Sequence, residues 1–338
     1  MTDVNALYNQ LLQPSPALLS DIARQEGDIL ILGAGGKMGP ALARLAKLSL
    51  DLIGSERKVI AASRFSEPGL QQELDALGIE TYAVDLLNEE QLRSLPDVKN
   101  VLYLAGTKFG TTGKESFTWA MNAYLPGRVA EKYADSNIVV FSTGNVYPLT
   151  AVDAGGATET LSPGPLGEYA QSCLGRERIF QFFSAKNNTP VFIYRLNYAN
   201  DVSYGVLLEI AKAVKEQKPI DLRMGYVNVI WQGDANEIAI RALNHCSVPA
   251  TVVNVTGPEI ISIKWLAEQF GKLLKQEPAF VNGEESTALL SNAAVSVSLF
   301  GYPRVLLTQM IELIAEWVKQ GGKTINKPTH FQERQGNF

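Results

Sequence analysis

The sequence is poor in the residues that build disulfide frameworks, metal centres and nucleic-acid-binding surfaces. Its two cysteines, Cys173 and Cys246, follow no disulfide pattern, and its two histidines, His245 and His330, have no second ligand at metal spacing. We therefore expect neither a disulfide scaffold nor a metal site. The net charge of −5 argues against the basic surface that nucleic acids and anionic membranes attract.

The sequence also shows no pattern typical of a targeting signal and no long hydrophobic run. No cationic segment followed by an apolar run opens the chain, and no apolar run is long enough to cross a bilayer. These features predict a cytoplasmic protein without a membrane or nucleic-acid partner. Apolar residues make up 46% of the 338 residues and charged residues 19%, which is enough for a sizeable core in one large or two smaller domains.

Short apolar segments alternate with helical stretches through the first two thirds of the chain. Strands are predicted at 29–32, 58–62, 79–84, 100–104, 137–141 and 190–194, with a late strand near 251–255. Helices are predicted between most of them, at 69–77, 89–95, 115–133 and 169–184. This alternation predicts an α/β fold with a doubly wound parallel sheet and right-handed crossovers.

The first predicted strand runs directly into a glycine-rich turn, in the stretch DILILGAGGKMG at 28–39. Gly33 allows a tight turn, Gly36 lets the backbone approach a ligand, and Gly39 lets the next helix pack closely on the strand. With Gly35, Lys37 and Met38 they form a predicted phosphate-binding turn at a helix N-terminus. The order of strand, glycine turn and helix indicates nucleotide binding.

Polar and small residues follow the other predicted strands, where ligands of parallel sheets bind. Ser63 and Arg64 stand where an acidic residue would bind the ribose hydroxyls of NAD, and the Arg64 guanidinium suits a ribose 2′-phosphate instead. NADP is therefore favoured, with NAD as the alternative. The further predicted cofactor-binding residues at strand ends are Asp85, Leu86, Ala105 and Gly106.

These segments, in this order, resemble the extended short-chain dehydrogenase/reductase superfamily, in its NAD-dependent epimerase/dehydratase branch. Asn122 stands in the helix where that family carries an asparagine. The matching stretches are GAGGKMG at 33–39, VDL at 84–86, YLAG at 103–106, VVFSTGNVYP at 139–148, NVIWQGDANEIAI at 228–240, NVTGPEIISIKWLAEQF at 254–270 and LFGYPR at 299–304.

The resemblance implies a Rossmann domain with a smaller α/β substrate lobe, and an oxidoreductase or epimerase that acts on a sugar or a related polyhydroxylated small molecule. It implies that Thr143 and Tyr169 are the catalytic hydroxyls, and it leaves a homodimer open. The Rossmann domain is expected at 28–197 together with the late strand, and the lobe at 198–250 and 256–338. Residues 1–27 are expected to form two short helices, as a packing extension or a dimer arm.

Cys173 stands where the family motif Tyr-x-x-x-Lys has its lysine. A phenol titrates near about pH 10, and a neutral thiol does not favour phenolate as an ammonium group does. Three hypotheses follow. Another cation, Lys108 or Lys114, replaces the lysine; or Tyr169 acts as a neutral acid, with Glu168 or Cys173 contributing; or the protein is a catalytically impaired dinucleotide-binding sensor or scaffold. Cys173 itself is expected to be a small buried apolar residue.

Three later residues refine these expectations. Arg195, at the end of the sixth predicted strand, is expected to be structural. Asn197 falls one residue before the family's asparagine, which weakens the case for a nucleotide-sugar substrate. Trp231 is expected either in the core or facing the substrate.

Overall fold

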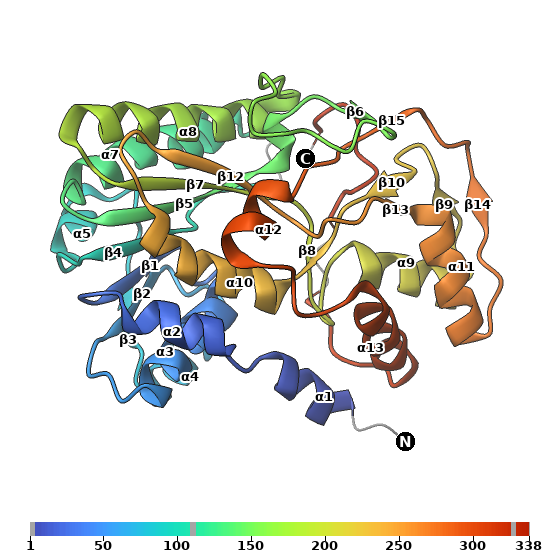
Figure 1. Ribbon diagram of the computed structural model, residues 1–338, viewed down its shortest axis with the longest axis horizontal. Coiled ribbons are helices and arrows are strands. Elements are labelled where there is room, and N and C mark those ends of the chain that lie inside the picture. The colour runs from blue at the N-terminus through green and yellow to red at the C-terminus, as the bar shows by residue number, and fades with distance from the viewer. Residues whose placement is uncertain (1–3, 109–112, 326–328, 338) are drawn as a thin grey trace.

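A seven-stranded parallel sheet forms the centre of the computed structural model, which describes residues 4–108, 113–325 and 329–337. The strand order is β12-β7-β5-β4-β1-β2-β3 (Figure 1), and the doubly wound fold predicted from the sequence is confirmed. The strands are β1 (Ile29–Leu32), β2 (Val59–Ser63), β3 (Glu80–Ala83), β4 (Asn100–Tyr103), β5 (Asn137–Thr143), β7 (Val191–Leu196) and β12 (Thr251–Val255).

Helices cover both faces of this sheet (Figure 1). Apolar residues of α5 (Glu89–Ser94), α7 (Leu125–Lys132) and α8 (Gly167–Asn187) pack in one core cluster with one face of the strands. The opposite cluster contains residues of α2 (Pro16–Ala23), α3 (Gly39–Leu52), α4 (Leu70–Ala76), α10 (Gln232–Arg241), the 3₁₀ helix η3 (Ala242–His245) and α12 (Ala294–Phe300). The inner strands, such as β1 and β4, are buried on both faces, which explains why their sequences are largely continuous apolar runs, whereas the edge strand β3 is only partly buried.

The helix predicted at 115–133 is interrupted by a π-helical turn. It consists of α6 (Glu115–Trp119), the π-helix η1 (Ala120–Tyr124) and α7. Asn122 lies in the π turn, is fully buried, and bonds to the loop after β4. Single π turns within α-helices are frequent at functional sites. The apolar periodicity of the sequence did not predict this one.

A smaller lobe packs beside the carboxyl ends of the strands (Figure 1). Its core is a separate cluster built on α9 (Val206–Lys215), α11 (Ile263–Leu274) and α13 (Leu307–Lys319), in which Trp231 is fully buried. The 3₁₀ helix η2 (Gly144–Val146) follows β5. The short strands of the lobe are β6 (Thr150–Ala151), β8 (Ala199–Asn200), β9 (Ile220–Asp221), β10 (Tyr226–Val227), β11 (Ile230–Trp231), β13 (Ile261–Ser262), β14 (Phe280–Val281) and β15 (Thr287–Ala288).

The N-terminal segment joins these two parts. Helix α1 (Val4–Leu11) packs in the core of the smaller lobe, where the Tyr8 ring meets Trp231 edge-on at 6.1 Å between ring centroids. Helix α2 packs against α3 and α10 beside the sheet. The two predicted helices are therefore present and pack on the chain itself. Within the described residues, no helix is long and apolar enough to span a membrane.

A buried ion pair connects α8 to the sheet. Arg195 of β7 donates from Nε and Nη2 to the Glu177 carboxylate at 2.9 and 2.6 Å, and both side chains are almost completely buried. Ser142 of β5 donates to the same carboxylate at 2.5 Å, and Arg195 Nη1 donates to the Tyr147 hydroxyl at 2.5 Å. Both carboxylate oxygens of Glu177 therefore accept hydrogen bonds, which agrees with a structural role for Arg195.

Removing one partner of this buried ion pair should lower the free energy of unfolding far more than removing one partner of an exposed ion pair. We expect Arg195→Met to lower the free energy of unfolding by about 3–5 kcal/mol, because Glu177 would be left buried and uncompensated. Arg223→Met is the control: Arg223 pairs with Asp221 but its side chain is 57% exposed, and surface pairs contribute at most about 1 kcal/mol. Urea unfolding measures both values, and similar losses in the two variants would contradict this account.

Candidate functional site

The turn after β1 is shaped by close backbone contacts. Gly33 has φ of +89°, and a Cβ on it would lie 2.7 Å from the Ala105 nitrogen, so only glycine lets the ends of β1 and β4 meet here. A Cβ on Gly39 would lie 2.3 Å from the Ala34 oxygen. Gly39 therefore allows α3 to pack against the turn, as the sequence predicted.

A narrow cavity of about 200 Å³ lies beside this turn. Its walls come from the carboxyl ends of β1, β2, β3 and β4, together with Met121 of the π turn. The predicted cofactor-binding residues that line it are Gly33, Gly35, Gly36, Ser63, Arg64, Asp85, Leu86, Ala105 and Gly106. Residues from separate parts of the sequence are thus brought to one edge of the sheet.

A large cavity of about 650 Å³ continues from the narrow one, and both are lined by Gly36, Leu104 and Gly106. Together they form a trough from the β2 and β3 ends to the boundary with the smaller lobe. The predicted residues that line the large cavity are Lys37, Met38, Thr143 and Tyr169, in addition to Gly36 and Gly106. Gly39 and Asn122 line neither cavity and are buried.

Thr143 and Tyr169 meet in the large cavity. Thr143 is the last residue of β5, Tyr169 lies in the first turn of α8, and their side chains are hydrogen-bonded. Burial raises the pKa of the Tyr169 phenol above its ordinary value, and a thiolate at Cys173 would raise it further, while Arg176 and Thr143 act to lower it. Because burial outweighs the other effects, the phenol keeps its proton at neutral pH.

Cys173 is a buried residue in which burial outweighs the nearby positive charges of Arg176 and Lys108. It is 1% exposed and packs with Val146, Tyr147 and Ala157. Burial raises the pKa of its thiol, so the reactive thiolate is disfavoured. This matches the expected role of a small apolar residue in the core.

Arg176 is a buried cation that the sequence reasoning missed. It lies on the same face of α8 as Tyr169, is 6% exposed, and donates to the Phe141 carbonyl oxygen at 2.7 Å and to Asn122 Oδ1 at 2.8 Å. A Cβ on Gly106 would lie 2.4 Å from its Nη2 atom, so the guanidinium packs directly against Gly106, which lines both cavities. A charged residue seven positions after a functional tyrosine, on the buried helix face, was the available signal.

The Asn122 amide connects Arg176 to the loop after β4. Its Oδ1 atom accepts a bond from the Thr107 backbone N–H at 2.9 Å, and its Nδ2 atom donates to the Thr107 carbonyl at 2.9 Å and to Ser172 Oγ at 3.0 Å. Thr107 is thus held on both backbone groups. The backbone directly before Lys108 is therefore tied to Asn122.

The two lysines predicted as replacement cations lie in different places. Lys108 lines the large cavity, with its Nζ atom 5.6 Å from the centre of the Tyr169 ring. Burial, and then the charge of Lys37, lower the pKa of Lys108 to about 8. Lys114 is exposed at the start of α6 and does not line the cavity. The structure therefore brings Lys108, but not Lys114, next to Tyr169.

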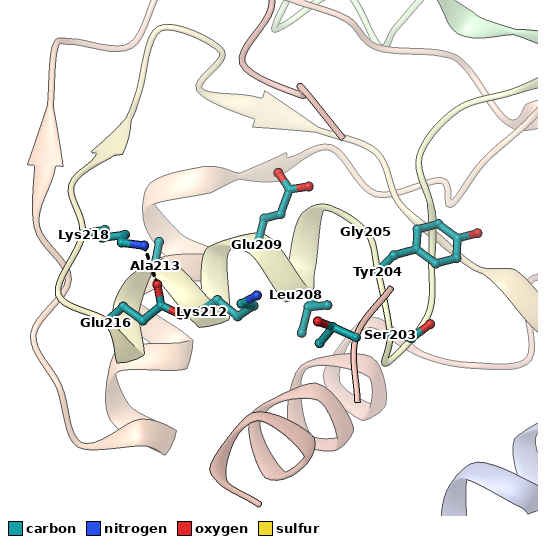
Figure 2. Close-up of a pocket in the computed structure, with 10 residues that line it drawn as sticks. Ser203, Tyr204, Gly205, Leu208, Glu209, Lys212, Ala213, Glu216 and Lys218 are labelled. Carbon is teal, nitrogen blue, oxygen red and sulfur yellow. Dashed lines mark ion pairs between the residues drawn. The ribbon is translucent and has the colours of Figure 1, made fainter. Parts of the chain in front are cut away.

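The smaller lobe and the C-terminal segment complete the large cavity with residues that the sequence did not single out for it. They are Tyr198, Tyr204, Thr329 and His330. Another cavity, of about 320 Å³, runs along α9, with Tyr204 and Glu209 toward its beginning and an ion pair between Lys218 and Glu216, 2.7 Å long, past the end of the helix (Figure 2). Among the described residues, no group of three or more His, Cys, Asp or Glu could hold a metal ion.

Comparison with solved structures finds the same fold. UDP-glucose 4-epimerase from Thermotoga maritima, solved with UDP-glucose, is 15% identical with a TM-score of 0.71, and the match covers 87% of this chain and 99% of that one. UDP-glucuronic acid 4-epimerase from Bacillus cereus, in complex with NAD, is 20% identical with a TM-score of 0.68, covering 88% and 100%. The NAD complex of dTDP-glucose 4,6-dehydratase from Bacillus anthracis is 18% identical with a TM-score of 0.73, covering 87% and 96%.

Sequence comparison identifies the family. A search of curated proteins gave no match. The model of the NAD dependent epimerase/dehydratase family matches residues 29–222, which is more than half of the 338 residues and includes the glycine turn, Thr143 and Tyr169. The chain therefore belongs to the NAD dependent epimerase/dehydratase family.

Proposed function

We propose that this protein is an NAD(P)-dependent oxidoreductase or epimerase that acts on a sugar or a related polyhydroxylated small molecule. The observation that carries the proposal is the hydrogen-bonded pair of Thr143 and Tyr169 in the large cavity, where that cavity joins the narrow one. A family enzyme needs a proton-transferring hydroxyl within reach of a bound cofactor, and this pair supplies it.

The trough fits an extended dinucleotide. Adding a Cβ to Gly36 would bring it no nearer than 3.4 Å to another atom, so its backbone is open to a ligand at the start of α3. Ser63, Arg64 and Asp85 would surround the adenosine ribose, and Gly106, which has no side chain above Arg176, would leave room for the nicotinamide ring. The bound cofactor would supply or accept a hydride at the substrate carbon.

The protonation state of Tyr169 favours carbonyl reduction as the chemical step. The phenol keeps its proton because burial raises its pKa, so Tyr169 can donate this proton to a carbonyl oxygen as the carbon gains the hydride. Thr143 would hold the same oxygen. In the reverse direction the Tyr169 phenolate would accept the proton of the substrate hydroxyl as the carbon gives up a hydride, and Arg176 is the cation that lowers the pKa of the phenol. An epimerase would use both directions in turn.

Replacing Tyr169 with Phe removes the proton donor without removing the ring. We expect Tyr169→Phe to abolish turnover and to leave cofactor affinity within about twofold, because general acid catalysis contributes about 10²–10⁴ in rate. The measurement is cofactor oxidation with a panel of keto-sugars, beside fluorescence titration of the cofactor. Tyr302→Phe is the control, since Tyr302 is 54% exposed. An unchanged turnover rate in Tyr169→Phe would contradict the role of Tyr169 as proton donor.

Arg64 should determine which cofactor binds. We expect NADP to raise the melting temperature more than NAD at equal concentration, since a ligand that binds only the folded state stabilises it by mass action. Arg64→Ser should weaken NADP binding about tenfold or more, the value of a charged hydrogen bond, and leave NAD binding unchanged. Equal effects of Arg64→Ser on both cofactors would contradict the assignment to the 2′-phosphate.

A second candidate function is a dinucleotide-binding sensor or scaffold that has lost catalysis. The observation that favours it is Cys173, which leaves no lysine one helical turn after Tyr169. Cofactor binding without turnover across a broad panel of sugars and polyols would support this function. Any reduction that depends on Tyr169 would exclude it.

A further inference from the structure

A cavity of about 370 Å³ lies where helix α1 of the N-terminal segment meets α3 and α10, and we call it the N-terminal cavity. It shares no lining residue with the narrow or the large cavity. Its lining residues on α3 are three or four positions apart and so share one face of that helix: Ala41, Arg44, Leu45 and Leu48. A molecule of one or two rings would fit, since roughly 150 Å³ is enough for benzene.

The walls of the N-terminal cavity are largely apolar. Leu11 and Leu12 line it on the side of α1, and Leu45 and Leu48 line it on the side of α3. Tyr8 also lines it, but its hydroxyl group already donates to Asp201 Oδ2 at 2.9 Å. An apolar molecule would bury its surface against such walls, whereas an ordered water molecule needs about three hydrogen bonds.

Asn236 of α10 is a buried polar side chain in this wall. It is 1% exposed, and its Oδ1 atom accepts no hydrogen bond from the part of the chain that the structure describes. Asn228 is buried to the same extent, but it donates to the Glu259 carbonyl and accepts from the Ser291 backbone N–H, both at 2.9 Å. Buried polar groups are nearly always bonded because leaving one unpaired costs free energy, so Asn236 indicates a hydrogen-bond donor from outside the chain.

Arg44 brings an unpaired donor to the same cavity. Its Nε atom is buried and has no partner within the described ranges, while its Nη2 atom pairs with Glu73 at 2.6 Å. The other arginine of the wall, Arg304, lies 3.5 Å from Asp234 and 3.3 Å from Glu237. Because carboxylates outside the wall already balance both guanidinium charges, an uncharged acceptor such as a carbonyl oxygen suits the Arg44 N–H group.

We propose that the N-terminal cavity is a second ligand site, which binds an uncharged molecule of one or two rings with one hydrogen-bond donor and one acceptor. The donor bonds to Asn236 Oδ1, the acceptor receives a bond from Arg44 Nε, and the rings pack against the leucines. The site goes beyond the proposed function, because no residue that lines it lines the cavities assigned to cofactor and substrate.

The test is calorimetric titration with two matched pairs of probes. Both para-hydroxyacetophenone and indole-3-carbaldehyde carry a donor and an acceptor, whereas para-methylacetophenone lacks the donor and 3-methylindole lacks the acceptor. We expect each complete probe to bind about fivefold or more tightly than its incomplete partner, because the partner leaves one buried protein atom unpaired. Equal affinities within both pairs, or no binding of any probe, would overturn the proposal.

Two variants place the binding in this cavity. Asn236→Leu should remove the preference for para-hydroxyacetophenone over para-methylacetophenone, and Arg44→Met should remove the preference for indole-3-carbaldehyde over 3-methylindole. Arg93→Met is the control, because Arg93 also pairs with a glutamate, Glu89, at 2.7 Å but does not line the cavity; it should keep both preferences. Preferences that persist in both cavity variants would mean that the probes bind elsewhere.

The stability of the protein without a probe distinguishes a binding role of Asn236 from a structural one. We expect Asn236→Leu not to lower the melting temperature, because the unpaired oxygen is removed and no hydrogen bond is lost. Asn228→Leu should lower it, because two hydrogen bonds are lost. A fall in Asn236→Leu as large as that in Asn228→Leu would show that Asn236 has a structural partner and would contradict the proposal.

Discussion

The buried pair of Arg195 and Glu177 is the interaction on which the arrangement of the site depends. It joins the end of β7 to the middle of α8, and Ser142 adds the end of β5 to the same carboxylate. Tyr169 lies two turns before Glu177 on that helix, and Thr143 directly follows Ser142. A charged group in the interior must keep its partners, so the pair fixes the helix and the strand that present the two hydroxyls to each other.

A second set of polar contacts lies near Tyr169, where position 173 holds a cysteine rather than a lysine. Arg176 holds Asn122, Asn122 holds Thr107, and Lys108 follows Thr107 into the large cavity. Positive charge is thus still present near Tyr169, but it is divided between a buried guanidinium below the trough and an ammonium group over the ring. Arg176 is engaged by a carbonyl and an amide, so its main effect on the phenol is electrostatic.

The sequence was sufficient to predict the sheet and the glycine turn because both depend on local patterns. Buried parallel strands such as Ile29–Leu32 are apolar runs, and the residues after them meet at one edge by topology. The π turn at Asn122, the buried Arg176 and the cavity wall formed by His330 were not predicted. They depend on which polar side chains find partners across the interior, and apolar periodicity carries no information about such pairings. The assigned roles of Thr143 and Tyr169 remain predictions.

The wall that the C-terminal segment adds to the large cavity has a consequence for how the protein folds. Thr329 reaches Glu209 across 120 residues of sequence, whereas the strands β1 to β5 are paired within the first half of the chain. Contacts between distant segments form slowly because the intervening chain must first be closed into a loop. The narrow cavity, whose walls all come from residues 33–121, can therefore take shape before the large one, which becomes enclosed only after both lobes have formed.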